Sequence, residues 1–393
     1  MWLIPIAVIA LVILGLLERK KHQAHVDAVP IRININGIRG KSTVTRLVTG
    51  ILVEANYKTV GKTTGTDARM LYWDTNEETP IIRKPQGPNI GEQKDVVKAA
   101  VDRNAEALVS ECMAVNPDYQ VTFQDTLIQA NIGVIVNVLE DHMDVMGPTL
   151  DEIADAFTAT IPYNGHLIVS NDEYVDFFKQ KAQERNTKVI VADNSKITED
   201  FLRQFEYTVF PDNASLALAV AEVLEIDAVT AKRGMLNAYP DPGAMRILPL
   251  FQKERPSFFI NGFAANDPAS TIHIWNRAVE LGYPAEDPII IMNCRADRVD
   301  RTEQFAVDVL PYLKSSLLLL IGESTGPIVE AYEAGVIPSD HLIDLEGASS
   351  AKIIETLPKD RGDRVIYGIG NIHGAGEPLI EELKKYKKDL GIS

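Results

Sequence analysis

The residues with the clearest chemistry lie in the stretch GIRGKST, which follows an alternating apolar pattern over Ile31–Ile35. Glycines let backbone N–H groups approach phosphate oxygens, a lysine ammonium reaches the terminal phosphates, and the next hydroxyl is placed for Mg²⁺. The sequence therefore predicts a loop that binds the phosphates of a nucleotide. The predicted nucleotide-binding residues of this loop are Gly37, Ile38, Arg39, Gly40, Lys41, Ser42 and Thr43.

The spacing of this loop is unusual for a nucleotide-phosphate loop. The common form G-x-x-x-x-G-K-[ST] would place a glycine at position 35, where this chain has Ile35. The spacing here is G-x-x-G-K-[ST], with Gly37 three residues before Gly40. This difference points away from GTPases and motor ATPases.

Acidic residues and one histidine follow two later apolar runs. Glu111 ends the run that begins at Ala107, and its carboxylate is expected to complete a Mg²⁺ site with Ser42. The segment NVLEDHMD, which contains His142, follows the next run and suits either a second divalent ion or a charge network around a phosphate. The alternatives are a solvated glutamate at a strand end and a polar loop that caps a helix.

Two further segments lie in the second half of the chain. The stretch CRADRVDR alternates guanidinium and carboxylate groups, so Arg295 and Arg298 are candidates for bidentate binding of substrate carboxylates. The glycine-rich turn GIGNIHG after a predicted strand is a weaker signal. Arg69 is a third candidate for offsetting a substrate's negative charge. The alternative for CRADRVDR is an exposed ion-pair loop.

The elements that must position these residues follow a repeated strand–helix pattern. The loop lies at the first turn of a strand–helix–strand unit, and further apolar runs bounded by turn signals follow it. Proline and glycine cluster in PDPGAMR, and a second strand–helix series begins after that cluster. The predicted class is α/β, with a P-loop-type parallel-sheet ATPase domain over residues 23–244 and a smaller C-terminal Rossmann-like domain over residues 245–393.

A segment without charge, Trp2–Leu17, precedes these domains, and Glu18 and a basic cluster follow it. It spans about 24 Å as a helix, against about 30 Å for a bilayer core. A cleaved signal peptide would carry its positive charge first, and a core helix would show a polar face. We therefore predict a single-pass transmembrane anchor over residues 1–22, in lipid through residues 2–17, with the catalytic domains on the cytoplasmic side of the cell membrane.

Composition limits the partners of the protein. Lys plus Arg number 39 and Asp plus Glu 55, which gives a net charge of −16. Because nucleic-acid binding relies on a basic surface, nucleic acid is excluded as a partner. An anionic substrate would instead need a local basic pocket. The two cysteines, far apart in sequence, predict buried reduced thiols and no disulfide framework.

The order of these motifs resembles the Mur ligase superfamily of ATP-dependent amide ligases. GIRGKST is similar to that family's phosphate loop, Glu111 falls where the family has a Mg²⁺-binding glutamate, and NVLEDHMD resembles the segment whose histidine serves a second metal. FPDNASLALA resembles the segment whose asparagine, here Asn213, lies near the nucleotide, and PGAMR, which ends at Arg246, resembles the link between domains. The resemblance implies catalytic roles for Lys41, Glu111 and His142, ATP contacts from Asn213 and Arg246, and metal ligation by Ser42, Glu111 and His142.

One departure and one further similarity narrow the assignment. Many members carry a carbamylated lysine about sixteen residues past the Asp-His pair, where this chain has Phe157. The segment GKTTGTDARMLYWDT resembles the ligases that form poly-γ-glutamate. That resemblance implies ATP with Mg²⁺ or Mn²⁺, glutamate and a growing chain as substrates, an acyl-phosphate intermediate, and small membrane subunits of a synthase complex as partners. It also allows a homo-oligomer.

Two other functions fit the same motifs. One is a ligase that adds glutamate to another acceptor, such as a pterin. The other is an ATP-driven export or scaffold subunit, whose ATP turnover would not need free glutamate. The arginine-rich strand end after the proline cluster favours a ligase.

Overall fold

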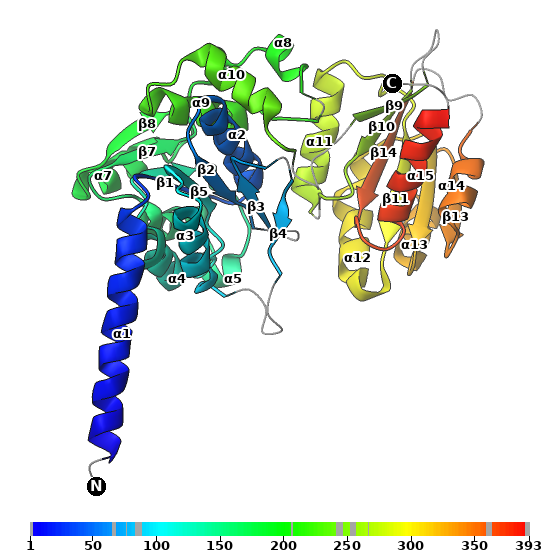
Figure 1. The fold of residues 1–393 in the computed structure, drawn as a ribbon. Coiled ribbons are helices and arrows are strands. Elements are labelled where there is room, and N and C mark those ends of the chain that lie inside the picture. The colour runs from blue at the N-terminus through cyan, green and yellow to red at the C-terminus, as the bar shows by residue number, and fades with distance from the viewer. Residues whose placement is uncertain are drawn as a thin grey trace. The chain divides into compact units, whose positions relative to one another are not determined.

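The computed structural model describes residues 3–64, 68–75, 77–82, 89–205, 207–240, 247–251, 257–265, 267–358 and 364–389. Its internal contacts divide the chain into two units (Figure 1). Unit 1 comprises Met1–Phe205 and Val209–Pro242, and unit 2 comprises Glu206–Thr208 and Gly243–Ser393. The domain limits predicted from sequence stay a prediction.

Unit 1 is built on a mainly parallel sheet whose described strands have the order β4-β3-β2-β5-β1-β6-β7-β8. Strand β1 lies in the middle and pairs in parallel with β5 and β6, whereas β3 and β4 extend one edge antiparallel. The strands are β1 (Ile31–Asn36), β2 (Thr59–Lys62), β3 (Arg69–Tyr72), β4 (Thr79–Pro80), β5 (Ala107–Glu111), β6 (Ile132–Ile135), β7 (His166–Val169) and β8 (Lys188–Val191). The central strands are buried on both faces, as parallel sheets require, and their buried residues include the polar Asn34 and Asn36.

Helices connect these strands, and several start at recognisable signals. Thr149 and Glu152 form a capping box at the start of α6, and Pro211 occupies the first turn of α9. The α-helices of unit 1 are α1 (Leu3–Asp27), α2 (Lys41–Glu54), α3 (Glu92–Asp102), α4 (Pro117–Thr122), α5 (Met143–Met146), α6 (Leu150–Phe157), α7 (Val175–Glu184), α8 (Glu199–Leu202), α9 (Pro211–Val223) and α10 (Ala228–Asn237). A π-helix, η1 (Phe123–Ile128), directly continues α4.

The helix α1 corrects the predicted anchor. Its uncharged part, Leu3–Leu17, rises about 22 Å, which is short of a bilayer core of about 30 Å. The helix then continues to Asp27 as part of unit 1, because Val26 is buried and His22 Nε2 is hydrogen-bonded at 2.9 Å to the carbonyl oxygen of Leu127. Nothing in the described ranges is a helix long and apolar enough to cross a membrane. The predicted transmembrane anchor and the single-pass cell-membrane localisation derived from it are wrong.

Unit 2 is a Rossmann-like sheet whose described strands have the order β13-β12-β11-β14-β10-β9. All neighbours pair in parallel except β9, which runs antiparallel to β10. The strands are β9 (Ile247–Phe251), β10 (Ser257–Asn261), β11 (Ile289–Cys294), β12 (Leu317–Gly322), β13 (Leu342–Glu346) and β14 (Arg364–Gly370). The last strand, β14, is inserted between β10 and β11, so these two consecutive strands are not neighbours in the sheet.

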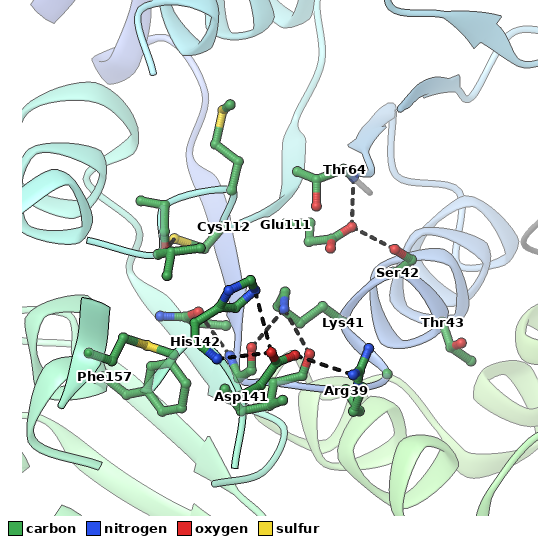
Figure 2. A pocket seen from close by; sticks show the side chains of 18 residues that line it. Arg39, Lys41, Ser42, Thr43, Thr64, Glu111, Cys112, Asp141, His142 and Phe157 are labelled. Carbon is green, nitrogen blue, oxygen red and sulfur yellow. Dashed lines mark hydrogen bonds and ion pairs between the residues drawn. The ribbon is translucent and has the colours of Figure 1, made fainter. Parts of the chain in front are cut away.

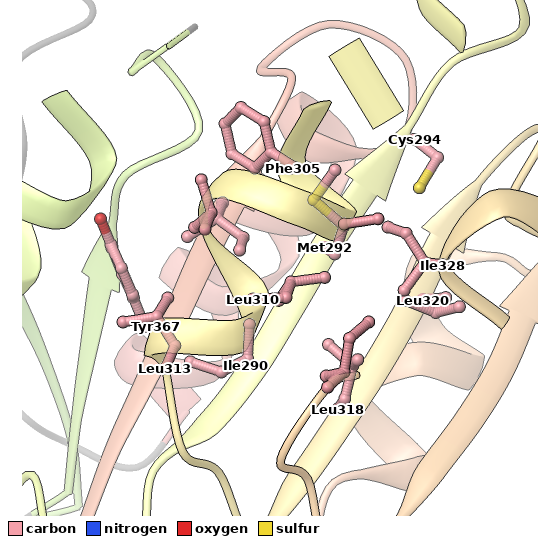
Figure 3. Close-up of a cluster of buried hydrophobic side chains, with 14 of the residues drawn as sticks. Ile290, Met292, Cys294, Phe305, Leu310, Leu313, Leu318, Leu320, Ile328 and Tyr367 are labelled. Atoms are coloured by element: carbon pink, nitrogen blue, oxygen red, sulfur yellow. The ribbon is translucent and has the colours of Figure 1, made fainter. Parts of the chain in front are cut away.

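Alternate residues of this sheet enter two cores. One core contains Ile290 and Met292 of β11 with helices α11 (Pro268–Glu280), α12 (Val299–Asp308) and α13 (Gly326–Glu333) (Figure 3). The other contains Ile289 and Ile291 with helices α14 (Ser350–Thr356) and α15 (Gly376–Asp389). Helices therefore cover both faces of this sheet.

Candidate active site

The phosphate loop connects β1 to α2 and depends on two glycines. Gly37 has φ +127° and Gly40 has φ +85°, conformations that L side chains rarely adopt. A Cβ atom at Gly37 would lie 3.0 Å from the amide nitrogen of Val136, and one at Gly40 would lie 2.6 Å from Oδ1 of Asn213. The loop therefore turns away from β1 while lying tightly against neighbouring backbone and against Asn213.

The loop borders a pocket of about 500 Å³ at the carboxyl edge of the sheet (Figure 2). Its walls come from the phosphate loop, from the segment after β5 and from the segment after β6, as expected for a parallel sheet. The lining residues are Asn36, Gly37, Ile38, Arg39, Gly40, Lys41, Ser42, Thr43, Thr64, Glu111, Cys112, Met113, Ala114, Val115, Asp141, His142, Met146 and Phe157. The structure thus brings together the predicted loop residues, Glu111 and His142.

Lys41 is the desolvated cation of this pocket. Its Nζ donates to the carbonyl oxygens of Gly37 at 2.7 Å and Ile38 at 3.0 Å. Burial lowers the pKa of Lys41, and the nearby Glu111 carboxylate acts in the opposite direction. A phosphate group would favour the charged form of Lys41, so the site suits an anion.

Ser42 and Glu111 form the donor set expected for Mg²⁺. Ser42 Oγ donates to Glu111 Oε2 at 2.8 Å, and the backbone amide of Thr64 donates to the same oxygen at 2.7 Å. Figure 2 shows the carboxylate held between these two partners. A hydroxyl and a carboxylate are oxygen ligands of the kind that Mg²⁺ takes alongside substrate phosphates, so these residues fit the ion.

The arrangement around His142 differs from that of a preformed metal site. Asp141 lies between Arg39 Nη2, at 3.3 Å from its Oδ2, and His142 Nε2, at 3.8 Å from its Oδ1. His142 has φ +50°, a left-handed conformation that is uncommon outside glycine. No cluster of three or more His, Cys, Asp or Glu side chains suited to a metal ion occurs in the part of the chain that the structure describes. Phe157, which lines the same pocket and is 1% exposed, gives this wall a phenyl ring.

The other predicted nucleotide and substrate residues lie in different places. Asn213 is buried in the first turn of α9, directly against Gly40. Arg69 begins β3, where its backbone amide donates to Thr63 Oγ1 at 3.2 Å, and it is not among the residues that line the pocket. Arg246 lies outside the described residues.

Arg295 and Arg298 belong to unit 2 and follow β11. Arg295 Nη2 forms an ion pair with Asp297 Oδ2 at 2.8 Å. Beside them, Asn293 Nδ2 donates to the carbonyl oxygens of Asn371 and His373, at 2.5 and 2.9 Å, so the turn after β14 is held against the end of β11. These arginines therefore share one edge of unit 2 with the glycine-rich turn.

Sequence reasoning missed three contributors to the site. The Thr64 amide is a backbone group, and the residue type does not predict which way a backbone N–H points. Asn137 was noted only as part of NVLEDHMD, yet its side chain makes three hydrogen bonds to the phosphate loop. Asn36 also accepts from the Gly37 amide at 2.8 Å, and its position at the end of an alternating strand was the available signal.

A parallel sheet with a lysine-bearing phosphate loop, followed by a Rossmann-like unit, defines an α/β nucleotide-binding protein. The sequence model of the Mur ligase middle domain matches residues 35–239, and that of the poly-gamma-glutamate synthase CapB C-terminal domain matches residues 247–386. The chain is 70% identical over 387 residues to PGA synthase CapB of Bacillus subtilis (strain 168), which covers 98% of each protein. It is 64% identical over 380 residues to the capsule biosynthesis protein CapB of Bacillus anthracis, covering 97% of this chain and 82% of that one.

These matches establish the family, and solved structures agree on the fold. The chain belongs to the Mur ligase family of ATP-dependent ligases, in its poly-γ-glutamate synthase CapB branch. The resemblance indicated by the motifs is thereby confirmed, as is the interpretation as a ligase. A bifunctional folylpolyglutamate synthase/dihydrofolate synthase from Yersinia pestis, solved in complex with AMPPNP and a Mn ion, has a TM-score of 0.63. It is 12% identical, and the match covers 93% of this chain and 92% of that one.

Proposed function

We propose that this protein joins glutamate residues into poly-γ-glutamate, using ATP to activate a carboxylate. The observation that carries the proposal is the edge of unit 1, where the desolvated Lys41 and the Ser42–Glu111 pair lie in one pocket. The names of the C-terminal family model and of the Bacillus subtilis relative supply the product, and the Mur ligase family supplies the reaction class. Within this proposal, residues 23–244 bind ATP and residues 245–393 form a separate Rossmann-like domain.

The residue roles follow from charge and position. Lys41 and the amides at the start of α2 hold the phosphates of ATP, since a helix N-terminus offers unpaired N–H groups to an anion. Ser42 and Glu111 hold Mg²⁺, or Mn²⁺ in its place, and the ion supplies neutralisation of phosphate charge when bound. Asn213 and Arg246 contact the nucleotide, and His142 orients charged groups around the phosphates.

The chemistry requires two displacements. A carboxylate oxygen of glutamate attacks the terminal phosphorus of ATP, a new C–O–P linkage forms, and ADP leaves. The amine of a second glutamate then attacks the acyl carbonyl, phosphate leaves with the C–O bond electrons, and the amine loses a proton. Positioning and charge neutralisation by Lys41 and Arg39 supply the acceleration of the first step.

The carboxylates of the substrate need cations in a protein that carries a net charge of −16. Arg295 and Arg298 at the edge of unit 2 are proposed for this task, with Arg69 as a further candidate. The growing chain would bring many carboxylates, so pairs such as Arg295–Asp297 would exchange partners when it binds. Partner subunits of a synthase complex and a homo-oligomeric state belong to the same proposal.

One incubation tests both reaction and substrate. The purified protein is given ATP, Mg²⁺ and each amino acid in turn, while ADP release and product mass are followed. The proposal expects ADP release that depends on glutamate and products separated by one glutamyl residue. Glutamate-independent ADP release, or glutamate attached to a different acceptor such as a pterin, would contradict it.

A further inference from the structure

We propose that Asn137 is a positioning residue for ATP, which holds the tip of the phosphate loop in the form that receives phosphates. The inference rests on the proposed phosphate site and adds to it a residue outside the loop. No ATP contact by Asn137 itself is required. Its action passes through the backbone of Ile38 and Arg39.

The geometry of Asn137 is specific to this turn. Its Oδ1 accepts hydrogen bonds from the amides of Ile38 at 3.1 Å and Arg39 at 3.0 Å. Its Nδ2 donates to the carbonyl oxygen of Arg39 at 3.0 Å. Both ends of the carboxamide are therefore used on two adjacent loop residues, and asparagine is the shortest side chain that carries its acceptor and its donor on two separate atoms.

The position of Asn137 explains why a side chain is needed. Strands β1 and β6 pair in parallel, and the last bond between them runs from the amide of Val136 to the carbonyl oxygen of Asn36 at 2.8 Å. The backbone of the loop then turns away at Gly37, so regular pairing stops there. The side chain of Asn137 continues the connection between the two strands one residue further, where the backbone cannot.

The position of the loop tip controls Lys41. The carbonyl oxygens that receive Lys41 Nζ belong to Gly37 and Ile38, which lie in the turn fixed by Asn137. With the amides of Ile38 and Arg39 occupied by Oδ1, phosphate oxygens are left to the amides of the first turn of α2. A loop without Asn137 would sample other shapes, and ATP binding would have to supply the ordering.

A matched pair of alanine variants tests the proposal. Asn131 directly precedes β6, whereas Asn137 follows it; its Oδ1 accepts from the Arg32 amide at 3.0 Å and its Nδ2 donates to the Pro30 carbonyl oxygen at 2.7 Å. Asn137→Ala and Asn131→Ala therefore each remove side-chain hydrogen bonds between a residue beside β6 and the chain near β1. Only the bonds lost in Asn137→Ala involve the phosphate loop. We expect Asn137→Ala to raise the KM for ATP about tenfold, with the KM for glutamate unchanged. Asn131→Ala should leave both KM values unchanged. It should lower the Tm about as much as Asn137→Ala does.

Three results would overturn the inference. The first is an unchanged KM for ATP in Asn137→Ala, and the second is an equal rise of that KM in Asn131→Ala. The third is a lower KM for ATP in Asn137→Ala, which would show that Oδ1 competes with phosphate for the loop amides. Should the alanine variant fail to fold, Asn137→Asp decides. It keeps the acceptor but loses the donor and adds a negative charge, so a KM for ATP that does not rise would equally refute the role.

A separate variant distinguishes this inference from the proposed function. If Lys41→Ala also left the KM and turnover of ATP unchanged, the phosphate site itself would be misplaced. If Lys41→Ala abolished turnover while Asn137→Ala had no effect, only the role of Asn137 would be refuted.

Discussion

Both units have polar groups at the carboxyl ends of parallel strands, but the cations at these two edges have different partners. In unit 1, the ammonium of Lys41 is partly buried and donates to two neutral carbonyl oxygens. In unit 2, the guanidinium of Arg295 contacts the carboxylate of Asp297, and both side chains are partly exposed. A bound anion would therefore stabilise the charge of Lys41 in unit 1. In unit 2, a substrate carboxylate would have to replace Asp297 as the partner of Arg295.

This difference predicts unequal consequences of mutation. Electrostatic interactions are stronger in a desolvated pocket than at an exposed edge, so changes in unit 1 should be larger. They should also act on different substrates, with ATP affected in unit 1 and glutamate in unit 2. The predictions below test that division.

Replacement of Lys41 by alanine is expected to have the largest effect. Loss of a preorganised cation in a desolvated site should lower kcat/KM by at least about 10²- to 10³-fold. The readout is ADP release in the presence of glutamate. Lys98→Ala is the control, because Lys98 lies on the exposed face of α3 and pairs with Asp102. Activity retained in Lys41→Ala would contradict the proposal that the edge of unit 1 binds ATP.

Replacement of Glu111 by glutamine tests the proposed ion site. The amide keeps the size of the side chain but removes its charge, so about 10- to 100-fold more Mg²⁺ should be needed for half-maximal activity. Excess Mg²⁺ should restore part of the rate. Glu140→Gln, in the exposed part of the segment after β6, should titrate like the wild type. The same Mg²⁺ dependence in both variants would refute the assignment.

Replacement of Arg295 by alanine tests the second edge. A lost charge-assisted hydrogen bond to a substrate carboxylate should raise the KM for glutamate about tenfold and leave the KM for ATP unchanged. Lys352→Ala, on the exposed surface of α14, is the control in the same unit. A change confined to the KM for ATP would reverse the roles given to the two edges.

The pH dependence of ATP binding is expected to show the smallest effect. Burial lowers the pKa of Lys41, so its ammonium group deprotonates at a pH below the ordinary pKa of 10.5. As pH rises, the KM for ATP should therefore begin to increase before pH 10.5 is reached. The sign for stability is opposite, since the unfolded chain holds this proton more tightly and the folded state gains stability as pH rises between the two pKa values. Lys41→Arg, which stays protonated, should lose this dependence of the KM; an identical pH profile would contradict it.

The sequence predicted those parts of the site that can be recognised from the types and spacing of the residues. Alternating apolar residues followed by glycines and a lysine predicted β1, the loop and α2, and acidic residues after apolar runs predicted the positions of Glu111 and His142. These predictions were possible because parallel strands bring their carboxyl ends to one edge. The CapB branch was predicted from the segment that begins at Gly61.

What the sequence left open depends on tertiary contacts. The amide of Thr64 and the carboxamide of Asn137 acquire their roles only through the chain direction at their positions. The predicted anchor was wrong because the charged residues after the apolar run were interpreted as the flank of a membrane segment. Those residues continue the helix, and Val26 packs in the core of unit 1.

The most direct test of the account is calorimetric titration of a non-hydrolysable ATP analogue, with Mg²⁺, into the wild type, Lys41→Ala and Arg295→Ala. The account predicts that the Lys41 variant loses most of the affinity and that the Arg295 variant binds like the wild type. Wild-type affinity in Lys41→Ala together with weakened binding in Arg295→Ala would contradict it.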